Sequence, residues 1–333
     1  MLGPIAQRPL RAWNTLMPQT TCVAVLGAGI MGHGIAQALA GGGARVLLAD
    51  RDLAVARGGW HAVEGNLDNL VDSGHCPPED AAALLSRITA VGSIQEAAAA
   101  AQLVVEAVPE VMSIKHDVLR QVAAVVSPET IIATNTSSFD IDDIAAVVHE
   151  PSLVVGSHWY NPAYLVPCVE VVRGTLTSDE TTQRTVAHLR EVGKLPVLAG
   201  NRAGFVGNRL QFALVAEAFR CVEEGVATAA DVDTIVRTSF GMRLAEYGPF
   251  QLADMGGLDT YQSVLRYLTE HLGDSFAPTA ALDDLVQRGR LGLKSSAGVY
   301  DYTAADLRHI TSERDHRLAQ QVAGNAASPP GGR

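Results

Sequence analysis

The chain is poor in cysteine and in aromatic residues. Only four of its 333 residues are cysteines, and 5% are Phe, Trp or Tyr. Cys22, Cys76, Cys168 and Cys221 lie far apart, without the paired spacing of a metal site or the density of a disulfide scaffold. We therefore expect reduced thiols in a cytoplasmic protein, and no metal site.

The chain also lacks any run of lysines or arginines. Its formal net charge is -11 at pH 7, so nucleic acid and anionic membrane surfaces are poor candidate partners. No formally charged residue occurs from position 20 to 44, a length that could span a bilayer. Seven glycines in that window favour a buried strand, turn and helix instead.

What is abundant is apolar sequence, at 47% of the residues, enough for about two domains. Short apolar runs alternate with amphipathic stretches, which predicts an α/β, Rossmann-like, doubly wound sheet over residues 21–200. The runs expected to form strands are residues 21–26, 45–49, 103–108, 130–134, 153–157 and 169–172.

Beyond about residue 201 the strand-like runs stop. Residues 206–224 predict a long, mostly apolar helix that Gly225 can end, so we expect an all-α domain over residues 201–325 for substrate binding and dimerisation. Residues 1–20 are expected to be a flexible leader and residues 326–333 a disordered tail. Capping boxes are predicted at Ser93 with Glu96, Thr177 with Glu180, and Thr228 with Asp231.

A glycine motif follows the first expected strand. Gly27, Gly29 and Gly32 form G-x-G-x-x-G, which allows a tight turn and brings the backbone close to a pyrophosphate. Asp50 ends the second strand, where a carboxylate can accept hydrogen bonds from ribose hydroxyls and disfavour NADP, although Arg51 could hold a 2'-phosphate. The cofactor-binding residues predicted in this motif are Gly27, Gly29, Ile30, Met31, Gly32 and Asp50. The expected cofactor is NAD.

His158 follows another apolar strand, and Glu170 lies twelve residues later. Oxidation of an alcohol needs a base of near-neutral pKa, and a carboxylate on the far ring nitrogen would fix the imidazole tautomer. The spacing alone also fits two structural residues.

Several segments in sequence order resemble the 3-hydroxyacyl-CoA dehydrogenase family, whose superfamily includes gulonate and carnitine dehydrogenases. The resemblance covers about residues 21–302. Its segments are VAVLGAGIMGHGIAQ, LVVEAVPEVMSIK, ATNTSS, HWYNPAYLVPCVEVV, GFVGNRL, GPFQLADMGGLD and LGLKSSAGVY. It implies an NAD-binding domain, a helical domain that forms a homodimer, and a cleft between them.

The resemblance also implies roles for particular residues. The implied catalytic residues are His158 as base, Glu170 as its partner, and Ser137 and Asn208 as hydrogen-bond donors to the reacting oxygen. The implied neighbours of the cofactor are Glu110, Lys115, Ser137, Asn161 and Lys294. The expected activity is therefore NAD-dependent oxidation of a 3-hydroxyacyl-CoA, or reduction of its 3-keto form.

Two regions depart from the fatty acyl members of the family. Residues 58–86 contain no lysine or arginine, although CoA phosphates favour basic residues there. Trp159, Tyr160, Ala163 and Tyr164 replace a phenylalanine-rich version of the segment after His158. A free 3-hydroxy acid, a pyridine-ring substrate and a carrier-bound acyl group therefore stay open as alternatives, as does a non-catalytic NAD-binding protein.

Overall fold

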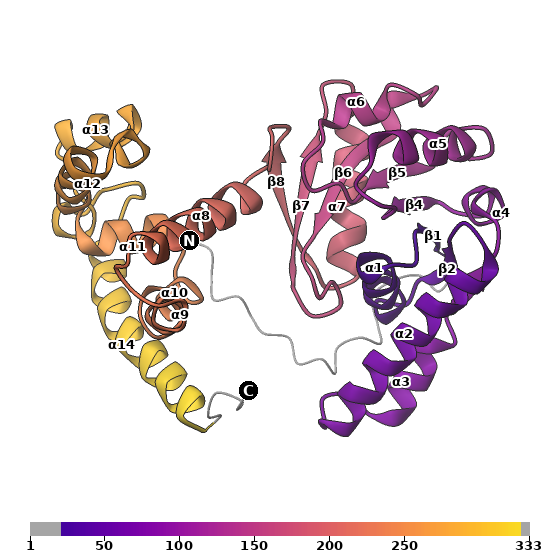
Figure 1. Ribbon diagram of the computed structural model, residues 1–333, viewed down its shortest axis with the longest axis horizontal. Helices are drawn as coiled ribbons and strands as arrows, with labels where there is room; N and C mark the ends of the chain where they lie inside the picture. The colour runs from indigo at the N-terminus through magenta and orange to yellow at the C-terminus, as the bar shows by residue number, and fades with distance from the viewer. Residues whose placement is uncertain (1–20, 328–333) are drawn as a thin grey trace. The chain divides into compact units, whose positions relative to one another are not determined.

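The computed structural model describes residues 21–327, so the predicted leader and all but the first two residues of the predicted tail lie outside the described part (Figure 1). The chain divides into two compact units, Met1–Ala213 and Leu214–Arg333. Their boundary falls inside helix α8 (Gly207–Glu223). Each unit is described below by itself.

The N-terminal unit is built on one eight-stranded sheet with the order β3-β2-β1-β4-β5-β6-β7-β8. The strands are β1 (Cys22–Leu26), β2 (Arg45–Ala49), β3 (Ile88–Val91), β4 (Leu103–Glu106), β5 (Ile131–Thr134), β6 (Val154–Trp159), β7 (Cys168–Arg173) and β8 (Leu195–Gly200). Neighbouring strands are parallel except β6 and β7, which are antiparallel. The predicted doubly wound sheet is confirmed.

Two strands, β3 and β8, were not predicted from the sequence. Each has several partly or fully exposed side chains, so neither reads as a buried apolar run. All six predicted strands are present, and their ends differ from the predicted ones by at most two residues.

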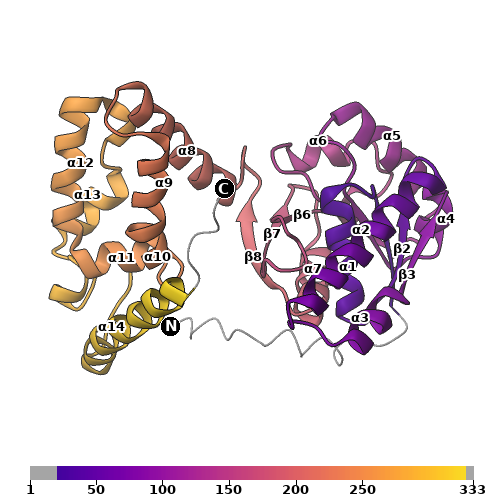
Figure 2. The ribbon, with the colours of Figure 1, turned by 60° about the horizontal axis from the view of Figure 1, so that its bottom comes forward.

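Helices cover both faces of the sheet (Figures 1 and 2). One core packs α1 (Ile30–Gly41), α2 (Leu53–Asp72), α3 (Pro78–Leu85) and α7 (Asp179–Glu191) against one face. The other packs α4 (Ile94–Ala99), α5 (Met112–Ala123) and α6 (Ile141–Ala145) against the opposite face. Alternate residues of β1 enter the two cores, because successive side chains of a strand point to opposite faces.

The predicted capping boxes have different outcomes. The Ser93 hydroxyl accepts a hydrogen bond from the Glu96 amide at 3.2 Å, as expected. The box predicted at Thr177 is wrong, because the Ser178 hydroxyl caps α7 one residue later. The Thr177 hydroxyl instead donates to the Val154 carbonyl at 2.6 Å and ties the turn to β6.

The C-terminal unit is helical, as predicted. It contains the second half of α8, α9 (Ala229–Thr238), α10 (Phe240–Leu244), α11 (Pro249–Gly256), α12 (Leu258–Leu272), α13 (Ala280–Gln287) and α14 (Ala304–Ala327). Gly225 follows α8 with a φ of +70°, and the Thr228 hydroxyl accepts from the Asp231 amide at the start of α9. The buried Asp254 carboxylate accepts from two backbone amides and from the Tyr302 hydroxyl, which closes the loop before α14.

The four cysteines are free. Over residues 21–327, no helix has the length and hydropathy required to cross a membrane.

Candidate active site at the carboxyl ends of the strands

The glycine turn has the geometry required for close approach to a phosphate. Gly27 has a φ of +98°, and a Cβ there would lie 2.5 Å from the Ala107 carbonyl oxygen. A Cβ on Gly32 would lie 1.6 Å from the Gly27 carbonyl oxygen. Around Gly29 a Cβ would meet nothing within 4 Å, and no side chain caps the first turn of α1. The uncapped amides of this turn therefore fit an anionic pyrophosphate.

Asp50 lies beside this turn at the end of β2. Its Oδ2 accepts a hydrogen bond from the Ala28 amide at 2.6 Å, and its Oδ1 accepts from the Arg51 amide. The Arg51 side chain is exposed and pairs with Asp52 at 3.5 Å. The glycine turn and the Asp50 carboxylate thus lie together and fit a dinucleotide.

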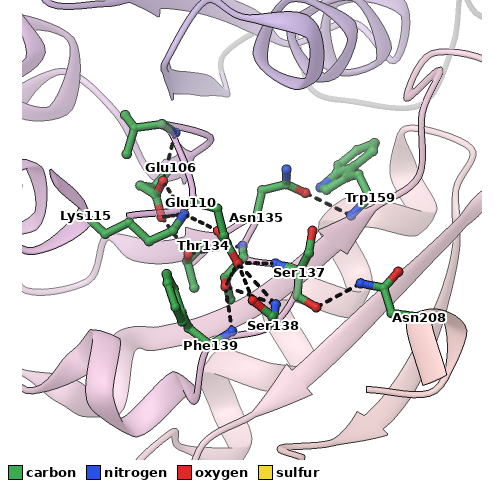
Figure 3. Close-up of polar contacts among 12 residues, drawn as sticks. Glu106, Glu110, Lys115, Thr134, Asn135, Ser137, Ser138, Phe139, Trp159 and Asn208 are labelled. Atoms are coloured by element: carbon green, nitrogen blue, oxygen red, sulfur yellow. Dashed lines mark hydrogen bonds and ion pairs between the residues drawn. The ribbon is translucent and has the colours of Figure 1, made fainter. Parts of the chain in front are cut away.

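A buried lysine joins two carboxylates after β4. The Lys115 ammonium lies 2.9 Å from Glu106 Oε1 and 3.1 Å from Glu110 Oε2, and the Lys115 side chain is 1% exposed. The Thr134 hydroxyl donates to Glu106 Oε2 at 2.6 Å. We call Glu106, Glu110, Lys115 and Thr134 the lysine cluster (Figure 3).

The lysine cluster fixes the loop after β5. Glu110 Oε1 accepts hydrogen bonds from the Thr136 hydroxyl at 2.6 Å and from the amides of Ser137 and Ser138 at 2.9 and 3.2 Å. Burial alone would raise the pKa of the Glu110 carboxyl. The bonds from Thr136 and Ser137, together with Lys115, outweigh burial and lower that pKa below its ordinary value. Glu110 therefore stays ionised and holds this loop.

Two side-chain amides connect the same loop to its neighbours. Asn208 Nδ2 donates to the Ser137 carbonyl at 3.0 Å, and the Trp159 amide donates to Asn135 Oδ1 at 3.0 Å (Figure 3). The structure thus brings Ser137 and Asn208 together, and their role as donors to a reacting oxygen stays a prediction. It leaves the Ser137 hydroxyl without a hydrogen bond to any described residue.

His158 and Glu170 face each other across the antiparallel strands β6 and β7. His158 Nδ1 lies 2.8 Å from Glu170 Oε2, and the two residues are only 4% and 3% exposed. Nε2 of His158 has no hydrogen-bond partner among the described residues. A proton on Nδ1 leaves Nε2 free to accept one from another group.

Three more donors contact the Glu170 carboxylate. The Tyr160 hydroxyl donates to Oε2 at 2.7 Å, and the amides of Val206 and Gly207 donate to Oε1 at 3.0 Å each. Burial alone would raise the pKa of the Glu170 carboxyl, but its hydrogen-bond donors outweigh burial and hold that pKa below its ordinary value. Glu170 therefore stays ionised, and its donors hold it next to the His158 imidazole.

Phe205 helps to place those two amides. It has a φ of +48°, a left-handed conformation that is costly for a bulky residue. Its ring is buried, with the centroid 5.6 Å from that of His158. This turn directs the amides at the start of α8 toward the carboxylate, and their hydrogen bonds offset its strain.

Asn161, predicted near the nicotinamide, is exposed at the end of β6. The segment after it is held by Lys194, whose ammonium donates to the carbonyls of Ala163 and Val166 at 2.6 and 2.9 Å. Burial lowers the pKa of Lys194 to about 8. No carboxylate pairs with it within residues 21–327.

Lys294, also predicted near the cofactor, lies in the C-terminal unit. Its ammonium forms an ion pair with Asp259, and both side chains are partly exposed. Its cofactor role stays a prediction.

Four groups that complete these networks were not predicted from the sequence: the side chains of Glu106, Thr134 and Lys194, and the Tyr160 hydroxyl. One signal was available, because Glu106 is an acid inside an otherwise apolar strand and therefore needs a buried partner. Nothing in the sequence pairs Lys194 with the carbonyls about thirty residues before it.

Both parts of the chain match models of one known protein family. Residues 22–202 match the model of the 3-hydroxyacyl-CoA dehydrogenase NAD-binding domain, and residues 204–302 match that of the C-terminal domain of the same family. A probable 3-hydroxybutyryl-CoA dehydrogenase of Bacillus subtilis is 36% identical over 84% of this chain and 96% of its own length.

Two further relatives are similar over most of their length. The 5-formyl-3-hydroxy-2-methylpyridine 4-carboxylate 5-dehydrogenase of Mesorhizobium japonicum is 35% identical over 89% of this chain and 95% of its own. A crystal structure of a 3-hydroxyacyl-CoA dehydrogenase from Archaeoglobus fulgidus aligns with a TM-score of 0.76 at 31% identity, covering 92% of this chain and 99% of the other. This chain is an NAD-dependent oxidoreductase, and it belongs to the 3-hydroxyacyl-CoA dehydrogenase family.

Proposed function

We propose that this chain oxidises the hydroxyl of a 3-hydroxyacyl-CoA with NAD, or reduces the 3-keto form, with His158 as general base and acid oriented by Glu170. The observation that carries the proposal is the buried His158–Glu170 hydrogen bond of 2.8 Å, which leaves Nε2 unpaired. A residue with only a structural role would have no need of an unpaired ring nitrogen.

In the oxidative direction, His158 Nε2 accepts the proton of the substrate hydroxyl while the carbon loses a hydride. Glu170 stabilises the imidazolium that forms, because its carboxylate already accepts from Nδ1. Ser137 and Asn208 are the proposed donors to the reacting oxygen, and Glu110 and the lysine cluster hold the Ser137 backbone in place.

NAD, when bound, supplies the hydride acceptor. The glycine turn and α1 would hold its pyrophosphate, and the Asp50 carboxylate would accept from the adenosine ribose. Asn161 and Lys294 are proposed at the nicotinamide side. Lys115 is proposed to act through Glu110, because its ammonium is buried between two carboxylates.

A second candidate function is oxidation of a substrate without CoA. The exposed side chains of α2 and the first turn of α3 include Asp68, Asp72 and Glu79, and residues 58–86 hold no lysine or arginine. Such a surface repels the phosphates of CoA. One similar protein is named for a pyridine carboxylate substrate, which supports this candidate.

The helical unit is proposed to pair with a second copy of the chain. The described residues of α8 include no buried side chain, although the helix carries many apolar residues. Its large apolar side chains with more than a third of their surface exposed are Leu210, Phe212, Leu214, Val215, Phe219 and Val222. Sedimentation at micromolar concentration tests this, and a monomer would contradict it.

The first experiment follows NADH absorbance with acetoacetyl-CoA, and then with free 3-hydroxy acids plus NAD. Rapid turnover of the thioester supports the first candidate. Turnover of a free acid alone supports the second. NAD binding with no turnover on either panel would contradict both and favour a non-catalytic NAD-binding protein.

The role of His158 is tested by His158→Ala. Turnover should fall by about two to four powers of ten, because the general base is lost, while NADH binding stays nearly unchanged. His75→Ala, at an exposed histidine in the loop after α2, is the matched control. Full turnover in His158→Ala would remove the assignment.

Asp50→Ala tests the cofactor assignment. The variant should lose affinity for NAD relative to NADP, because it removes both the acceptor for the ribose hydroxyls and the negative charge that disfavours a 2'-phosphate. Fluorescence titration with NADH and NADPH measures the ratio, and an unchanged ratio would show that Asp50 does not contact the ribose.

A further inference from the structure

Tyr160 departs from the phenylalanine-rich segment of the fatty acyl enzymes, and its hydroxyl has a specific place in the structure. It lies 2.7 Å from Glu170 Oε2, the same oxygen that accepts from His158 Nδ1 at 2.8 Å. One carboxylate oxygen therefore serves both the candidate base and a phenol.

The surroundings keep the phenol in that position. A Cβ on Gly207 would lie 1.7 Å from the Tyr160 hydroxyl oxygen, so only glycine leaves room for it at the start of α8. The Tyr160 ring also packs on His158, with ring centroids 4.9 Å apart. The hydroxyl is thus enclosed between an imidazole, a carboxylate and a helix start.

At working pH the Tyr160 phenol keeps its proton, so it acts toward Glu170 as a hydrogen-bond donor. Burial, followed by the hydrogen bond to Glu170, raises the pKa of the Tyr160 hydroxyl well above its ordinary value. The neighbouring Cys168 thiol also has a raised pKa, because of burial and then the Glu170 charge. Tyr160 and Cys168 are therefore both neutral.

We propose that Tyr160 is a positioning residue, which acts on His158 through their shared oxygen of Glu170. The inference rests on the proposed role of His158 as base. A second donor on Oε2 withdraws charge from the oxygen that stabilises the imidazolium, and it also prevents the carboxylate from rotating. His158 consequently gives up its proton more readily than it would beside Glu170 alone.

In the described part of the N-terminal unit, the titratable groups linked to His158, directly or through Glu170, lie on β7 and directly after β6. Glu170 and Cys168 belong to β7, and Tyr160 follows the end of β6. From the turn before α8 come the apolar Phe205 ring and two backbone amides, which carry no titratable group. Removal of the Tyr160 hydroxyl therefore takes away one hydrogen-bond donor to Glu170 Oε2.

The test is Tyr160→Phe, which keeps the ring and removes the hydroxyl. The titration midpoint of the His158 ring, followed by NMR and assigned from the spectrum of His158→Ala, should move up by about 0.5–1 pH unit. The acid limb of the kcat profile should move to higher pH by the same amount, with a smaller change in KM. Tyr164→Phe is the matched control, because the Tyr164 hydroxyl has no hydrogen bond to any described residue, and its midpoint should equal that of the wild type.

A second variant covers the case in which Tyr160→Phe does not fold. Gly207→Ala places a methyl group where the hydroxyl lies, and it should move the His158 midpoint in the same direction. An unchanged midpoint in a folded Tyr160→Phe protein would overturn the inference, whatever the turnover. A midpoint that moves without the kcat profile would support the inference and contradict His158 as the base.

Discussion

The N-terminal unit contains two buried carboxylate networks that differ in how their charge is balanced. The lysine cluster sets one ammonium between two carboxylates. Glu170 instead accepts from two backbone amides, a phenol and an imidazole. The first network thus balances its carboxylates with a lysine, and the second surrounds its carboxylate with hydrogen-bond donors.

Lys194 is a third case, an ammonium that donates to two carbonyl oxygens and lies 5.5 Å from the centroid of the Trp159 ring, with no carboxylate partner among the described residues. Substitutions at the three sites therefore separate the effect of burying a charge from the effect of placing an opposite charge beside it.

Lys115→Met should lower the free energy of unfolding by about 3–5 kcal/mol, because it leaves the buried Glu106 carboxylate without a cation. Urea denaturation measures the loss. Arg120→Met on the same helix is the matched control, since Arg120 pairs with Asp117 in solvent at 2.8 Å and its loss should cost less than about 1 kcal/mol. Equal losses of unfolding free energy in the two variants would show that the lysine cluster does not stabilise the fold.

Glu170→Gln should lower kcat by about 10²–10⁴-fold. The amide nitrogen of glutamine can donate to Nδ1, which would place the imidazole proton on Nε2 and block proton acceptance. Steady-state assays with NADH absorbance measure the effect, and Glu129→Gln on the surface serves as control. If Glu170→Gln lost as much stability as Lys115→Met and kept its kcat, Glu170 would have a structural role and not a catalytic one.

Because Lys194 is buried, we expect the free energy of unfolding to depend on pH. Its pKa is about 8 in the folded state, against an ordinary value of 10.5. Between these values the unfolded chain binds more protons, so the free energy of unfolding gains up to an amount on the order of 3 kcal/mol as pH rises. The stability of the wild type relative to Lys194→Met should therefore increase from pH 7.5 to pH 10 in urea titrations. A constant difference would show that Lys194 titrates normally.

Much of the fold was predictable from local sequence. Six strands appear as apolar runs, and the glycine turn and α8 follow from glycine placement and from helical length. The strands β3 and β8 were missed because their side chains are partly exposed, so their sequences lack a buried run. The start of α7 was misplaced because Thr177 and Ser178 can both cap a helix, and the choice depends on a tertiary contact of Thr177 with β6.

The candidate site was only partly predictable. His158 and Glu170 were selected from residue type, strand position and the resemblance, and the structure brings them into hydrogen-bond distance. Their roles stay predictions. The contacts of Tyr160 with Glu170 and Gly207 could not be predicted, because they depend on which way a strand end turns and on the start of a helix forty-seven residues later.

The antiparallel pairing of β6 and β7 has one more consequence. Glu170 is placed opposite His158 by a ladder that runs from the Gly156–Val172 pair to the Trp159–Val169 pair. The pair is thus encoded by a single hairpin, whose register is set by the buried side chains of the two strands and by the length of the connecting loop. A one-residue shift of this register would turn one of the two side chains to the opposite face of the sheet, so changes in loop length should be tolerated less well than changes in its exposed side chains.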